Sequence, residues 1–97
     1  MKIDDLMLGL KRRLETKPEW IALKEPDREF IFEAMREGVV NAITFCSEAI
    51  TQEQALEGAR RSGLALGKHL KTVSMWTHIV ILGEFSTTLL DAMRLTR

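Results

Sequence analysis

The chain has 97 residues, enough for one domain with a single modest core and too few for two such domains. Its 14 basic and 14 acidic side chains cancel, so no net charge draws it toward nucleic acid or an anionic membrane. Hydrophobic residues make up 45% of the chain, as in globular proteins, and the longest uninterrupted apolar run (79–82) is far short of the about 20 residues that a membrane-spanning helix needs.

The cysteine and the first residues bear on the compartment. A single cysteine, Cys46, cannot form an internal disulfide, and its place among small residues predicts a buried thiol that acts as a small hydrophobic group. Lys2 is followed at once by Asp4 and Asp5, without the apolar stretch of a secretory signal. We therefore expect a cytoplasmic protein that does not associate with a membrane.

The start of the chain predicts one amphipathic helix and one short helical turn. Apolar residues recur at helical spacing over residues 3–15, and acidic residues open this segment while basic residues close it, as the helix dipole favours. Thr16, Pro18 and Glu19 follow in the arrangement of an N-cap, a first-turn proline and a capping-box carboxylate. They predict a short helix over residues 18–23 that carries Trp20 inward.

Two long helices joined by a short turn are expected in the middle of the chain. The first should begin at Pro26 or Asp27 and end near Glu48, because a proline is tolerated in a first turn and only a glycine interrupts the segment. Thr51 and Gln54 form a capping box for the second, which should end near residue 71.

The last helix is expected over residues 75–95, with Ser74 as its cap. The β-branched run at residues 78–85 leaves a strand open as an alternative. A lone strand in a helical chain would need a partner strand from a second subunit, which favours the helix.

Small residues occupy every fourth position on both central helices. The earlier row is Ala34, Gly38, Ala42 and Cys46, and the later row is Ala55, Ala59, Gly63 and Gly67. Because positions four apart share one helix face, the rows can meet across a turn at residues 50–51, which pairs Gly38 with Gly63. The pattern predicts a close-packed antiparallel hairpin that Gly63→Leu would force apart.

Charges support the same register. It places Glu33 near Lys68 and Glu29 near Lys71, so the packing and the charges are consistent with one fold-back. We expect a single domain over residues 1–97, an all-α, four-helix up-and-down-like bundle built on this hairpin.

No residue pattern indicates an enzyme or a metal site. The row of carboxylates on the second long helix is best explained as a solvated face paired with lysines, since neither His69 nor His78 follows a glutamate by three residues. Cys46 and the two histidines lack zinc-site spacing, and no glycine-rich phosphate loop occurs. We expect no catalysis, no cofactor and no metal.

A DNA-binding regulator is an alternative function. Ala59, Gly63 and Leu64 match the small residue, turn glycine and apolar residue of a helix-turn-helix motif. The nucleic-acid contacts would then be Arg60, Arg61, Lys68, His69 and Lys71. Polar residues at the inward positions that follow, together with the neutral net charge, weigh against this alternative.

The favoured function is a regulatory or adaptor protein that binds another protein, as a homodimer. The last helix carries more apolar surface than one side of a peripheral helix can bury. The expected interface residues are Trp76, Ile79, Val80, Ile81 and Phe85. Trp76 should lie near the dimer interface whether residues 78–85 form a helix or a strand.

Overall fold

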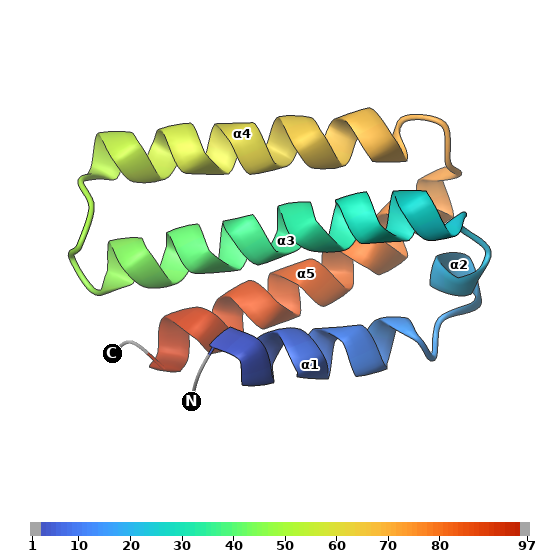
Figure 1. The fold of residues 1–97 in the computed structure, drawn as a ribbon, viewed down its shortest axis with the longest axis horizontal. Helices are drawn as coiled ribbons and strands as arrows, with labels where there is room; N and C mark the ends of the chain where they lie inside the picture. Colours follow the sequence, from blue (N-terminus) through green and yellow to red (C-terminus); the bar gives the residue numbers. More distant parts are fainter. Residues whose placement is uncertain (1–2, 96–97) are drawn as a thin grey trace.

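The computed structural model describes residues 3–95, and this part of the chain is helical with short connections (Figure 1). The helices are α1 (Ile3–Leu14), α2 (Pro18–Ile21), α3 (Glu25–Cys46), α4 (Gln52–Leu70) and α5 (Met75–Leu95). The predicted all-α architecture, with four long helices around an α3–α4 hairpin, is confirmed. The helical alternative for residues 78–85 is also confirmed, because α5 runs through them unbroken.

Two of the predicted helix caps are present. The hydroxyl of Thr51 accepts a hydrogen bond from the backbone N–H of Gln54 at 3.2 Å, and Gln54 Oε1 accepts one from the N–H of Thr51 at 2.9 Å. This capping box opens α4 as predicted. The hydroxyl of Ser74 accepts from the N–H of Thr77 at 3.2 Å and so caps the start of α5.

The predicted cap at Thr16 is wrong. Its hydroxyl donates to the carbonyl of Arg13 at 2.7 Å, at the end of α1, and Lys17 is the residue that precedes α2. The carbonyls in the last turn of a helix lack a partner within the helix, so a nearby hydroxyl can donate to one of them. The same hydroxyl then does not accept from an amide of the next helix. Trp20 nevertheless points inward as expected and is 6% exposed.

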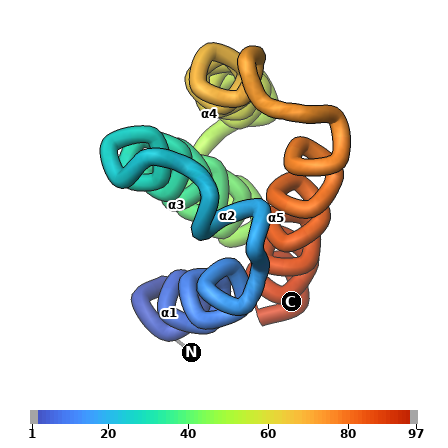
Figure 2. The backbone as a smooth tube through the Cα atoms, turned by 90° about the vertical axis from the view of Figure 1, so that its right-hand side faces the viewer, coloured from blue at the N-terminus to red at the C-terminus, as the bar shows by residue number. Residues whose placement is uncertain are grey.

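The core lies where α3 meets α1 and α5. Seen along the bundle (Figure 2), α3 lies between α4 on one side and α1 on the other, and α5 runs beside α1 and α3. The fully buried side chains of this core include Leu10, Leu14, Ile31, Met35, Val39 and Ile81. α4 packs mainly against α3 and adds Leu66 and Leu70 at its carboxyl end.

The α3–α4 contact forms around Gly58. The amide of Asn41 on α3 donates from Nδ2 to the carbonyl of Ala55 at 2.9 Å, and its Cγ lies 2.7 Å from where a Cβ on Gly58 would be. Near the other end of the hairpin, the rings of Phe30 and His69 stack with centroids 4.7 Å apart. Asn41 with Gly58 and Phe30 with His69 define a register within two residues of the predicted one.

The predicted facing of the two small-residue rows is wrong. Gly38 faces α5, where an added Cβ would lie 2.7 Å from Phe85 Cζ, and Gly63 would meet nothing within 4 Å. A step of four residues turns about 40° past a full helical turn, so each row winds around its helix by about 120° over three steps. Ala55 begins at the α3 contact, but Ala59, Gly63 and Gly67 are exposed.

The predicted charge pairs across the hairpin are also absent. Neither Glu33 with Lys68 nor Glu29 with Lys71 forms an ion pair, and all four side chains are exposed. The cause is the same rotation, because the lysines lie on the outer side of α4. His69 lies on the inner side instead, with its Nδ1 3.9 Å from a carboxylate oxygen of Asp27.

A candidate interface on the last helix

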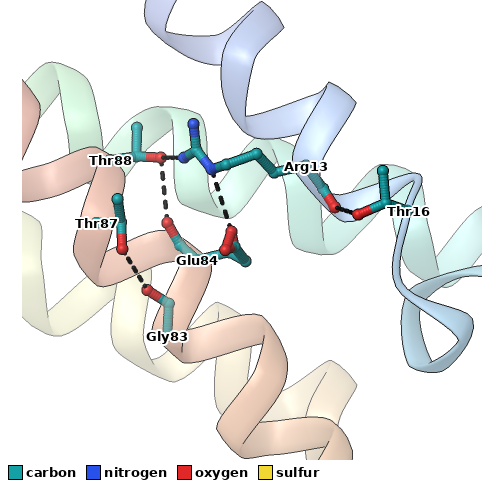
Figure 3. A network of polar contacts seen from close by, with 6 residues as sticks. All are labelled: Arg13, Thr16, Gly83, Glu84, Thr87 and Thr88. Carbon is teal, nitrogen blue, oxygen red and sulfur yellow. Dashed lines mark hydrogen bonds and ion pairs between the residues drawn. The ribbon is translucent and has the colours of Figure 1, made fainter.

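A polar network fixes one side of α5 to α1 (Figure 3). Arg13 donates from Nε to the Glu84 carboxylate at 3.1 Å and from Nη2 to the Thr88 hydroxyl at 2.7 Å. The same hydroxyl donates to the backbone carbonyl of Glu84 at 3.1 Å. Thr88 is 1% exposed, so these partners satisfy a buried hydroxyl and hold α5 in one rotation about its axis.

Two of the predicted interface residues lie on the inner side of α5. Ile81 is 0% exposed and belongs to the core, so its predicted place at an interface is wrong. Phe85 is half-buried, and its ring fills the space beside Gly38 on α3. Val80 is half-buried at the edge of the helix. Apolar residues surround α5 almost completely, so hydrophobicity alone does not separate its inner from its outer side.

The opposite side of α5 is an exposed apolar surface, which we call the outer face. It consists of Met75, Trp76, Ile79, Leu82, Gly83, Ser86 and Leu90. Steps of three and four residues keep these positions on one side of the helix, over a length of about 22 Å at 1.5 Å per residue. Trp76 is 61% exposed, Ile79 54% and Leu90 55%.

None of the seven side chains of the outer face is charged, and the cation of Arg94 lies one turn beyond Leu90. The acidic residues of α5 are Glu84, which turns to Arg13, and Asp91, which lies on the flank and approaches Arg94 at 3.9 Å. Solvent-exposed helix faces normally carry charged and polar side chains. A contiguous apolar face of this length on a small protein is typical of a surface that another molecule covers.

Trp76 is held in place at one end of the outer face. Its indole Nε1 donates to the carboxylate of Glu19 on α2 at 3.1 Å. This bond satisfies the one polar group of the indole and leaves the ring available for contact. Buried tryptophans with a satisfied N–H are frequent anchors of protein interfaces.

The basic residues proposed as DNA contacts lie on α4 or, for Lys71, directly after it, and their surroundings differ. Lys68, Lys71 and Arg61 are exposed, whereas His69 is half-buried against Phe30. Arg60 binds Glu57 at 2.6 Å, and this hydrogen bond lowers the pKa of the Glu57 carboxyl. Part of the positive charge on α4 is therefore neutralised within the helix itself.

The helix-turn-helix motif itself is not formed. α4 is one continuous helix from Gln52 to Leu70, which confirms the predicted helix and contradicts the turn at Gly63 that the DNA-binding alternative requires. Glycine costs about 1 kcal/mol in a helix interior, and the residues before and after it in α4 can offset this cost because most of them favour a helix. Without that turn, no recognition helix is separated from the rest of α4.

Two open grooves flank α3 on its acidic side. One, of about 750 Å³, lies between α3 and α4 and includes Arg36, Asn41 and Arg61. The other, of about 660 Å³, lies against α2 and has Trp20 and Phe32 in its lining. Glutamates line both grooves, but no buried polar side chain in residues 3–95 is left without a hydrogen-bond partner that a ligand would supply.

Other site types have no support in the described part of the chain. Residues 3–95 contain no group of three or more histidine, cysteine or acidic side chains arranged to hold a metal ion. Cys46 is half-buried and unpaired with another cysteine. None of the described helices is long and apolar enough to span a membrane.

Comparisons with protein-family models, with curated proteins and with solved structures found no significant match to this chain. The candidate site therefore rests on the geometry of the chain alone.

Sequence reasoning found part of this surface and missed the rest. Trp76 and Ile79 were predicted and do lie on the outer face, whereas Met75, Leu82 and Leu90 were not. The available signal was the alternating three- and four-residue spacing that links Met75, Ile79, Leu82 and Ser86.

Proposed function

We propose that this chain is a small non-enzymatic regulatory or adaptor protein that works as a homodimer, held together through the outer face of α5. The observation that carries the proposal is the exposed, uncharged apolar surface of α5 on a helix whose other side is anchored by Arg13. Leaving such a surface in water is unfavourable by about 25 cal/mol for each Å² that a partner would cover.

A second copy of the chain suits this surface better than a charged partner does. None of the seven residues of the outer face is charged, and the cation of Arg94 lies only beyond its end. The chain itself has no net charge, so two copies do not repel each other over long range. Two-fold dimers are the commonest solution for self-complementary surfaces of this kind.

A pair of aspartate substitutions tests the proposal. Ile79→Asp places a carboxylate within the proposed interface, and burying an unpaired charge there costs several kcal/mol. The matched control is Leu64→Asp on α4, where the leucine is 61% exposed and lies outside the outer face.

Size-exclusion chromatography with light scattering gives the mass of each variant, and circular dichroism reports its helix content. We expect wild type and Leu64→Asp to be dimers and Ile79→Asp to be a monomer of unchanged helicity. A monomeric wild type, or a dimeric Ile79→Asp, would contradict the proposal.

A further inference from the structure

We infer that the two copies pair their α5 helices antiparallel, about a two-fold axis that passes between Gly83 and Ser86. This inference rests on the proposed function and specifies its geometry. The starting observation is that the outer face has large side chains at both ends and small ones in the middle. Met75, Trp76 and Ile79 occupy one end and Leu90 the other, while Gly83 and Ser86 lie in the middle.

The small middle residues allow close approach of two helix backbones. A Cβ built on Gly83 would meet nothing within 4 Å, so the chain itself leaves this space open. Two helices that cross at Gly83 and Ser86 can bring their axes to the short end of the usual 8–10 Å range. The larger side chains on either side of the crossing then cover each other.

The antiparallel register matches apolar residues with apolar residues. The two-fold axis lies at the level between residues 84 and 85. A residue of one copy is then level with the residue of the second copy for which the two residue numbers add up to 169. Gly83 then faces Ser86 of the second copy, and Ile79 faces Leu90. Thr87 lies at the edge of this contact, where its hydroxyl donates to the carbonyl of Gly83 in its own helix at 3.1 Å and so keeps a hydrogen-bond partner.

Charge favours the same orientation at the ends of the pair. Arg94 follows Trp76 by five helical turns and so lies on the same side of α5. In the antiparallel register Arg94 comes beside Met75 and Trp76 of the second copy, where Glu19 binds the indole. A cation therefore approaches a carboxylate at both ends of the dimer, and the helix dipoles oppose each other favourably.

A parallel pair lacks these advantages. It would bring the two Arg94 side chains together, along with the like ends of the helix dipoles. Like charges directly opposite each other are unfavourable in a closely packed contact. The antiparallel arrangement is therefore the one that the described surface supports.

Cysteine cross-linking distinguishes the two orientations. In a Cys46→Ala background, which removes the native thiol, the single variants Ile79→Cys and Leu90→Cys are prepared, and Leu64→Cys serves as an exposed control on α4. Each is oxidised mildly alone and in an equimolar mixture with another. Disulfides form only where the two Cα atoms approach within about 7 Å.

The inference predicts that mixing Ile79→Cys with Leu90→Cys moves most of the protein into a covalent heterodimer, whereas each variant alone gives little. Self-linkage of Ile79→Cys at position 79 would indicate a parallel pair and overturn the inference. Sedimentation of the reduced variants is measured alongside. Dimers that fail to form the 79–90 disulfide overturn this geometry only, whereas monomers overturn the proposed function as well.

Discussion

Gly38 on α3 and Gly63 on α4 belong to rows with the same four-residue spacing, but their surroundings differ. A Cβ on Gly38 would collide with the ring of Phe85, and a Cβ on Gly63 would extend into open space. The difference arises because each row winds around its helix while the neighbouring helix stays on one side. A small residue in a four-residue row therefore indicates a close contact between helices only where a neighbouring helix lies on that side.

Gly38→Leu should give the largest loss of stability. The new side chain would compete with Phe85 for a site between α3 and α5 that the ring already fills, and overpacking of this kind costs about 1–3 kcal/mol. Urea unfolding at a fixed protein concentration measures the change. Gly67→Leu is the matched control, since nothing lies within 4 Å of its Cβ position. Equal urea midpoints for Gly38→Leu and Gly67→Leu would contradict the claim that Gly38 is close-packed and Gly67 is not.

Gly63→Ala should change stability in the opposite direction. The substitution adds no collision, and replacing an interior helical glycine by alanine gains about 1 kcal/mol of helix propensity. The melting temperature should therefore rise. A lower melting temperature would show that α4 packs against another helix at this position, as the sequence alone predicts.

Gly58→Ala should have the smallest net effect. The propensity gain of about 1 kcal/mol is offset because the methyl group displaces the Asn41 amide from its bond to the Ala55 carbonyl, a bond worth about 0.5–1.5 kcal/mol. In an Asn41→Ala background that cost disappears, and Gly58→Ala should stabilise as Gly63→Ala does. If the two backgrounds respond alike, the contact at Gly58 is not what joins α3 to α4.

The predictable parts of the fold are those that neighbouring residues determine. Thr51 with Gln54 and the cap at Ser74 act within one helical turn, and the sequence locates both. The fold-back of the hairpin was also predictable to within two residues. Its helix rotation was not, because it depends on the Asn41 contact with Gly58, a glycine outside the four-residue row.

The candidate site was predictable only in part for a similar reason. The excess of apolar residues on α5 is visible in the sequence, but the side that faces the core depends on Arg13, which reaches Glu84 from 71 residues away. No local pattern reports that pairing. The sequence therefore predicts Ile81 at the interface although it is buried, and it does not single out Leu90, which is exposed.

The central claim is that a second copy covers the outer face of α5, and the fluorescence of Trp76 tests it most directly. Trp76 is 61% exposed in the single chain and Trp20 is 6% exposed, so acrylamide should quench one of the two tryptophans in a monomer. Quenching is measured over a series of protein concentrations, with Ile79→Asp as a monomeric reference. We predict that the quenchable fraction falls as concentration rises in the wild type and stays constant in the variant. A wild-type fraction that equals the variant's at every concentration would contradict the claim.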